Sequence, residues 1–388
     1  MTRTARTRSR SLSHVGTYTP TTHGVVSGTP HVSTRNYTCS ISDYHGRPVV
    51  ASALTSTQYK GNGLRLNGQA TSLYSSSSVG AGDKFDDFPI GPSTSLTTTP
   101  LAAPSGWYLD TVAGTNPSRP VMTPPELLQD LIDIPGQLRS LGNLIRKPKS
   151  LMSAKELSSH YLCVQFGWLP LIEDIRQLLD LQSYIIKRSA ELNKLYSGSG
   201  LRRRLKFADD TAVEAGVSSF PLYGPSNYVD SHYSVTVARK SWATITWKPS
   251  TPPPYHPDDS RWNDLSRRIV LGLTVEGMAK GLWNVIPWTW LLGWFTNVGK
   301  YTLAYSNTVP ATHSEACFMS ESVVTYSPGS VTFRNCTSDS ACSLSGAFEA
   351  STKTRSVSGS LTPGFNVPFL DTFRLSILGA LFTQRTMR

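Results

Sequence analysis

The feature that most constrains the fold is a change of residue pattern that recurs in long blocks. Residues 123–196 place apolar side chains three and four positions apart, which is typical of amphipathic helices, whereas residues 228–248 alternate apolar and polar side chains as strands do. Blocks of this length do not match units in which single strands alternate with single helices. We therefore predict an α+β fold, elongated overall, in which a helical bundle region and an antiparallel β-sheet region are each discontinuous in sequence.

The block boundaries define the two expected regions. The β-rich region comprises residues 1–122 together with 207–250 and 307–365, and the helical region comprises 123–206 together with 258–306 and 366–388. Residues 1–120 are rich in Ser, Thr, Gly and Pro, which predicts short strands or loops. A turn is expected at Ser327-Pro328-Gly329, and helical spacing is expected in the last segment, from Leu370 to Leu381.

Helix starts are indicated by capping patterns. Thr123 with Glu126, and Ser153 with Glu156, have the spacing of capping boxes, and Asp258 or Asp259 is expected to start a later helix. The second of these helices is expected to continue beyond Pro170 with one apolar face. That face consists of Leu171, Ile172, Ile175, Leu178, Leu179, Ile185 and Ile186.

Charge and cysteine usage narrow the class of protein. Lys and Arg number 37 against 26 Asp and Glu, a net charge of +11, which favours phosphate-bearing partners or an anionic surface. Five cysteines without a CxxC pair indicate neither a disulfide framework nor an iron–sulfur site, and fit a reduced cytoplasm. No apolar segment follows the N-terminal arginines, so an ordinary secretory signal is not expected. We interpret the apolar stretch Leu282–Val298 as core rather than as a membrane span.

Catalytic and metal motifs are not evident in the sequence. Neither a GxSxG elbow, a Walker loop nor an HExxH motif occurs, so we expect no enzymatic activity, no small-molecule substrate and no cofactor. Four residues of metal-ligating types have spacings unlike common zinc modules, and we expect them to be buried or incidental side chains. They are His313, Cys317, Cys336 and Cys342.

Basic residues are concentrated in one part of the chain. Between Gln137 and Lys206 there are thirteen Lys or Arg against five Asp or Glu, which favours a nucleic-acid-facing edge over the alternative of a solvated helical surface. The candidate RNA-binding residues are Arg146, Lys147, Lys149, Arg202, Arg203, Arg204 and Lys206, with Arg385 and Arg388 as weaker candidates. Residues 1–80 hold eight Lys or Arg and one acid, Asp43. That part can approach RNA or an acidic surface, or it is a solvated strand face.

Three stretches, in this order, resemble one known family. They are Gln165-Phe166-Gly167-Trp168-Leu169-Pro170-Leu171 followed by Asp174-Ile175; Trp283, Pro287 and Trp294 with Asn297-Val298-Gly299; and Leu370-Asp371 with Gln384-Arg385. Together they resemble the maturation proteins, or A proteins, of levivirus-like single-stranded RNA bacteriophages. Gly293 and Asn284 stand where this family commonly has acids. The tryptophans from Trp283 to Trp294 are expected to be core rather than a base-stacking platform.

The resemblance implies a virion protein present as a single copy. Such a protein binds a 3′-proximal structured element of the phage genomic RNA, replaces a coat-protein dimer in the capsid shell, attaches the virion to a host pilus through pilin and enters the cell with the RNA. It is made in the host cytoplasm during assembly. Two alternatives are a host-lysis protein that inhibits cell-wall synthesis and a structural RNA-binding capsid component without receptor activity.

Overall fold

The structure is a computed structural model, and it describes residues 4–45, 52–73, 81–90, 99–121, 158, 161–162, 164–223, 226–256, 259–274, 296–357 and 372–386. The chain divides into two compact units. Unit 1 comprises Met1–Ser105, Lys206–Ala243 and Cys317–Ser358, and unit 2 comprises Gly106–Leu205, Thr244–Ala316 and Gly359–Arg388.

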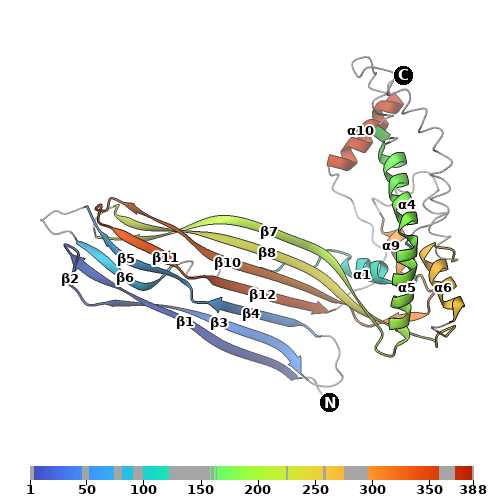
Figure 1. The fold of residues 1–388 in the computed structure, drawn as a ribbon, viewed down its shortest axis with the longest axis horizontal. Helices are drawn as coiled ribbons and strands as arrows, with labels where there is room; N and C mark the ends of the chain where they lie inside the picture. Colours follow the sequence, from blue (N-terminus) through green and yellow to red (C-terminus); the bar gives the residue numbers. More distant parts are fainter. Residues whose placement is uncertain are drawn as a thin grey trace. The chain divides into compact units, whose positions relative to one another are not determined.

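A twelve-stranded antiparallel sheet is the main feature of the fold (Figure 1). Its strands follow the order β11-β5-β6-β1-β3-β4-β12-β10-β8-β7, with β2 beside β1 and β9 beside β8. The strands are β1 Thr4–Thr22, β2 Val25–Val26, β3 His31–His45, β4 Leu54–Gly61, β5 Leu64–Thr71, β6 Ala81–Ile90, β7 Leu201–Pro221, β8 Tyr228–Pro249, β9 Ala311–His313, β10 Cys317–Arg334, β11 Ala341–Ser345 and β12 Phe348–Val357.

The described helices are short and belong to unit 2. They are α1 Trp107–Thr115, the π-helix η2 Val164–Trp168, α4 Leu169–Leu179, α5 Leu181–Tyr196, α6 Ser260–Val270, α9 Val298–Ala304 and α10 Thr372–Thr386. The predicted fold class, a helical bundle region plus a sheet region, is therefore wrong: the described chain is mostly one large antiparallel sheet with short helices.

The core of unit 2 explains why the helical spacing was misleading. Leu109 of α1, Leu192 of α5 and Trp262 of α6 are buried in one cluster with strand residues. Ile245 and Trp247 of β8 belong to the same cluster. A helical period identifies the apolar face of a helix but does not identify what covers that face. Here strand residues cover part of it, so an independent bundle is not needed.

Unit 1 has its own core, which is rich in aromatic side chains. Phe85 and Phe88 of β6 pack edge-to-face against Phe220 of β7, with ring centroids 5.0 and 5.1 Å apart. Phe348 of β12 packs against Tyr37 and other rings. Because these rings come from strands far apart in sequence, the core closes only when the whole order of strands is in place.

Several sequence predictions are confirmed. Strand β8 covers the alternating block, and Val235, Ile245 and Trp247 are buried as the alternation requires. Helix α6 begins after Asp259, whose carboxylate accepts a hydrogen bond from the Arg261 backbone N–H at 2.9 Å. Helix α10 matches the expected C-terminal helix.

The predicted turn at Ser327-Pro328-Gly329 is wrong, because β10 runs through it from Cys317 to Arg334. The ladder between β10 and β12 ends at Tyr326 opposite Phe348. Pro328 therefore lies beyond that ladder, where a missing N–H does not interrupt pairing with β12. Gly329 suits a close approach, because a Cβ there would lie 2.7 Å from the His232 carbonyl oxygen.

Two other expectations also fail. The N-terminal part forms long strands, with β1 covering 19 residues and β3 covering 15. The apolar face predicted after Pro170 is not continuously buried, since Ile172, Leu179 and Ile186 are 45, 80 and 60% exposed. The helix breaks at Asp180 between α4 and α5, so a stripe with one helical period does not stay on one face. The helices expected from Thr123 and Ser153 lie largely outside the described residues.

Candidate nucleic-acid interface

The connection from α5 to β7 brings several cations of unit 2 together. Gly200 ends this connection with a φ of +76°, in the left-handed region that favours glycine. A Cβ at this position would lie 2.5 Å from the Trp247 carbonyl oxygen and 3.2 Å from Cγ of Lys248. The chain can therefore pass close to the end of β8 only with glycine at this position. This close approach places the exposed Lys248 beside the start of β7.

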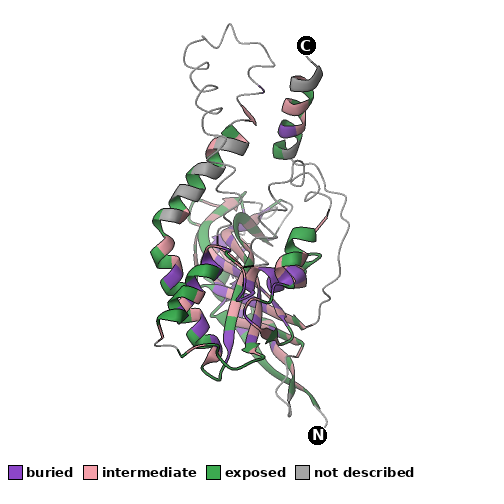
Figure 2. Cartoon of the chain, turned by 90° about the vertical axis from the view of Figure 1, so that its right-hand side faces the viewer, coloured by how far each residue is buried: buried purple, intermediate pink, exposed green. Residues whose placement is uncertain are grey.

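Because alternate residues of a strand point to opposite sides, the three consecutive arginines of β7 differ in exposure. Arg202 and Arg204 are exposed, whereas Leu201, Arg203 and Leu205 face inward. Figure 2 shows how exposed and less exposed positions follow one another along the elements of the chain. Alternate residues of a strand are about 6.6 Å apart, so the two exposed guanidinium groups rise from the same side of β7 at a regular spacing. We call Lys194, Arg202, Arg204 and Lys248 the basic turn; Lys194 is exposed in the last turn of α5.

Arg203 has a different environment from its neighbours. Its side chain is 11% exposed and forms an ion pair with Glu191 of α5. The same carboxylate lies 3.2 Å from Nη1 of Arg188. Arg203 therefore ties β7 to α5, and its side chain does not lie on the exposed side of β7 with those of Arg202 and Arg204.

Arg188 is the most buried cation of this group, at 4% exposure. It donates hydrogen bonds to the carbonyl oxygens of Pro117 and Arg119, both at 2.9 Å. Burial lowers its pKa to about 10, and burial also lowers the pKa of Arg119. Both groups stay protonated at neutral pH.

Glu191 thus forms ion pairs with two guanidinium groups, and a third, that of Arg119, interacts electrostatically with all three, which leaves an excess of positive charge inside unit 2. Partly buried charge is screened by salt less than exposed charge is. The excess therefore adds to the positive potential of the basic turn, which begins one residue away on the same strand.

Among the other predicted RNA-binding residues, the structure describes the side chain of one more, and that residue lies outside this group. Lys206 is exposed on β7 but belongs to unit 1. Four of the other candidates lie outside the described residues, namely Arg146, Lys147, Lys149 and Arg388. Only the backbone of Arg385 is described, in the last turn of α10. Three residues of the family motif also lie outside the described residues, namely Trp283, Pro287 and Trp294.

The described part of the family motif lies at helix boundaries. Gln165 and Trp168 belong to the π-helix η2, whose backbone also includes Phe166 and Gly167. Pro170 is the second residue of α4. Asn297 precedes α9, and Gly299 is the second residue of that helix. These positions place two of the three motif stretches at the starts of helices in unit 2.

From the sequence, Arg203 was predicted to bind RNA like Arg202 and Arg204, whereas Lys194 and Lys248 were not predicted as candidates. The sequence did contain a signal that Arg203 faces inward. Arg203 alternates along β7 with three apolar residues of the inward face, Leu201, Leu205 and Phe207. Lys248 had no such signal, because its place depends on how closely Gly200 approaches β8.

No protein-family model matches this sequence, and no curated protein shows significant similarity to it. Within the described ranges, no cluster of three or more His, Cys, Asp or Glu side chains is arranged to hold a metal ion, and this covers His313, Cys317, Cys336 and Cys342. No helix among the described residues is both long and apolar enough to span a membrane.

Proposed function

We propose that this chain is a maturation protein of a single-stranded RNA bacteriophage and that the basic turn binds the genomic RNA. The observation that carries the RNA-binding proposal is the pair Arg202 and Arg204, exposed on one side of β7 at alternate positions. Long cationic side chains on a rigid strand reach phosphate oxygens without disturbing the core behind them. The target is a 3′-proximal structured element, recognised by its shape and loop bases.

The three stretches that resemble maturation proteins support the assignment in a second way. They are far apart in sequence, yet all of them belong to unit 2, the unit that holds the basic turn. Tyr161, just before the first stretch, forms a hydrogen bond of 2.7 Å with Ser376 of α10. In this proposal the chain occupies one position in the capsid shell, and it also attaches the virion to a host pilus.

The RNA-binding part is tested by the salt dependence of binding. Each phosphate contact contributes about 0.7 to 0.9 to the slope of log K against log salt, so Arg202→Gln with Arg204→Gln is expected to reduce the slope by about 1.4 to 1.8. The matched control is Arg261→Gln with Arg267→Gln, which removes the same charge from α6. Those two arginines already pair with Asp259 and Asp264. Equal slopes for the wild type and the Arg202/Arg204 variant would exclude the basic turn as the RNA site.

The proposed roles in the capsid and in attachment to the pilus are tested with phage particles. Ultraviolet cross-linking in purified virions is expected to join peptides around residues 194–204 to one discrete region near the 3′ end of the RNA. Particles that lack the chain are expected to hold RNA but fail to adsorb to pili. Adsorption without the chain would leave an RNA-binding capsid component, and lysis of cells expressing the chain alone would favour a host-lysis protein.

A further inference from the structure

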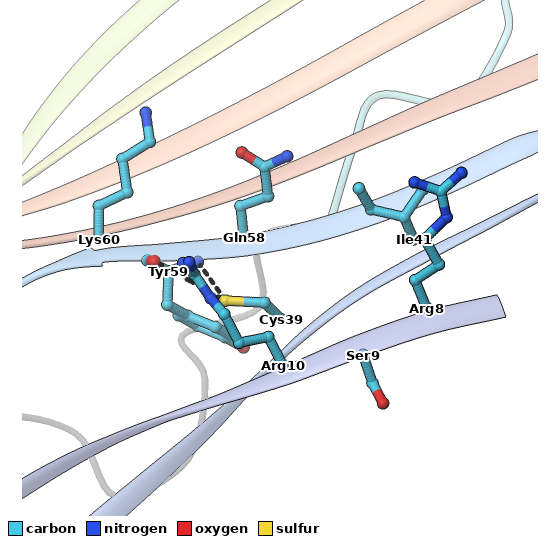
Figure 3. Close-up of a pocket in the computed structure, with 8 residues that line it drawn as sticks. All are labelled: Arg8, Ser9, Arg10, Cys39, Ile41, Gln58, Tyr59 and Lys60. Atoms are coloured by element: carbon cyan, nitrogen blue, oxygen red, sulfur yellow. Dashed lines mark hydrogen bonds between the residues drawn. The ribbon is translucent and has the colours of Figure 1, made fainter.

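A hollow of about 320 Å³ lies in unit 1 where β3 and β4 part (Figure 3). The ladder between these strands joins only Ser40–Ser42 to Thr55–Thr57. Beyond it, the backbone N–H of Tyr59 donates to Sγ of Cys39 at 3.3 Å. A side chain thus takes the place of a backbone acceptor and holds the two strands apart, which opens the hollow.

The lining of the hollow is basic and has no carboxylate. Arg8 and Arg10 come from β1, and Lys60 comes from β4. Figure 3 shows Arg8 and Arg10 on the same side of β1, with Ser9 pointing to the other side. Ile41, also in the lining, adds an apolar surface beside these cations.

Three cations of this face, Lys60 of the lining among them, have a carboxylate directly opposite on the neighbouring strand. Arg6 pairs with Asp43 at 2.6 Å. Lys353 pairs with Glu321 at 2.8 Å, and Lys60 pairs with Glu349 at 3.4 Å. The face therefore neutralises these three cations with carboxylates across adjacent strands, whereas Arg355 donates to the Ser52 carbonyl oxygen.

This pattern is interrupted at the hollow. Ile41 lies opposite Arg8, and Cys39 lies opposite Arg10. Both arginines are exposed, and neither has an ion-pair partner in the described part of the chain. Arg8 and Arg10 thus lack the opposing carboxylate that neutralises three other cations of the face.

We propose that this hollow binds an acidic protein segment in an extended conformation, with carboxylates two residues apart that contact Arg8 and Arg10. Alternate residues of an extended segment have the same spacing as alternate residues of β1. An arginine binds a carboxylate through two parallel hydrogen bonds, so the contact has a defined geometry in addition to its charge attraction. The short aliphatic stem of a glutamate fits against Ile41. The inference concerns unit 1 and does not depend on RNA binding by the basic turn.

The aromatic side chain of the site argues for a peptide over RNA. The Tyr59 ring stacks on Phe348 with centroids 5.7 Å apart and an interplanar angle of 10°, and it also contacts the Tyr37 ring at 5.2 Å. Proteins that bind single-stranded RNA stack bases on exposed aromatic rings. Tyr59 is engaged within the core cluster and does not offer such a ring.

The test uses the full chain and fluorescence anisotropy with a labelled synthetic peptide of alternating Glu and Ser. Arg8→Gln with Arg10→Gln is expected to weaken binding about tenfold, because two exposed charge contacts are lost. The control, Lys353→Gln with Arg355→Gln, removes the same charge from alternate positions of the same face. Lys353 already has Glu321, and Arg355 donates to the Ser52 carbonyl oxygen at 2.6 Å. This control is expected to change the affinity less than about twofold.

Three results would overturn the proposal. They are failure of the acidic peptide to bind the wild-type chain, an equal loss of affinity in both double variants, and an Arg8/Arg10-dependent preference for oligouridylate over the peptide. The last result would assign the hollow to phosphate rather than to carboxylate. Thermal unfolding of both variants, followed by circular dichroism, establishes that each is folded at the temperature of the measurement.

Discussion

The carboxylate of Glu191 on α5 lies between the guanidinium groups of Arg188 and Arg203. This one carboxylate therefore joins α5 to the start of β7. Arg119 adds a third guanidinium, which lowers the pKa of Arg188 further after burial and is itself affected by Arg203. The stability of unit 2 thus depends on a charge that has no substitute within the cluster.

Replacing Glu191 with Gln is expected to destabilise the protein by about 2 to 3 kcal/mol, because it leaves buried cations without a counter-charge. Urea unfolding at low salt measures the loss. Added phosphate is expected to recover part of it by supplying anions. The comparison variant, Arg203→Gln, leaves Glu191 paired with Arg188 and is expected to cost only about 1 kcal/mol. Similar losses for both variants would contradict the argument.

Two glycines with nearly the same backbone conformation provide a matched test of close packing. Gly63 has a φ of +76° and Gly106 has a φ of +75°. A Cβ at Gly63 would lie 2.3 Å from Nδ1 of the buried His14, whereas a Cβ at Gly106 meets nothing within 4 Å. Gly106→Ala is expected to cost about 1 kcal/mol from backbone strain alone.

Gly63→Ala introduces that strain and also displaces His14, so we expect a total loss of about 2 to 4 kcal/mol. His14 cannot move freely, because its Nε2 is 3.2 Å from the Gly61 carbonyl oxygen and its ring packs against Tyr37 and Phe348. Chemical denaturation of the two variants gives the comparison directly. Equal losses at the two positions would mean that His14 is not held in place.

The same histidine predicts a pH dependence of stability. Burial lowers the pKa of His14 below its usual value near 6.5. The unfolded chain then binds a proton more readily than the folded chain does, so the free energy of unfolding falls as the pH drops below about 6.5 and is constant above it. Unfolding followed between pH 7.5 and pH 5 is expected to show this loss. His14→Gln, which does not titrate, is expected to have a flatter profile; an unchanged profile would assign the dependence to other groups.

Asn116 closes the end of α9. Its amide Nδ2 donates to the carbonyl oxygens of Ser306 at 2.9 Å and Leu303 at 3.0 Å, and its Oδ1 accepts from the Ser118 backbone N–H at 2.8 Å. The residue is 2% exposed. Carbonyl groups at a helix C-terminus have no partner within the helix, so this side chain supplies one.

Asn116→Asp keeps the size of the side chain and its acceptor but removes the donor. We expect a loss of about 2 to 4 kcal/mol, because a carboxylate is then buried against carbonyl oxygens. Thermal unfolding at neutral pH measures it. Since protonation of the introduced carboxylate restores a donor, lowering the pH is expected to reduce the difference from the wild type. A larger difference at low pH would contradict this account.

The parts of the fold that were predictable are those fixed by local pattern. The alternation through Val235 and Trp247 is enough to identify β8, and Asp259 is enough to place the start of α6. The length of β1 was not predictable in this way, because polar side chains occupy both of its faces, arginines on one and serines on the other, and weaken the alternation of apolar with polar residues.

Pairings between strands that are distant in the sequence were also not predictable. The register of Lys60 opposite Glu349 joins residues almost three hundred positions apart, and nothing local encodes it. The same limit applies to the hollow of unit 1. The excess of cations before residue 80 was visible, but the absence of carboxylates opposite Arg8 and Arg10 depends on the register of β1 with β3.

The order of strands ends at β7, so the backbone groups on one side of that strand have no neighbour in the described sheet. An unpaired strand edge is a template on which a second copy of the chain can add its own strand. Exposed charged side chains oppose such pairing through mutual repulsion. Arg202 and Arg204 stand at this edge. They therefore oppose the addition of a strand from a second copy at this edge.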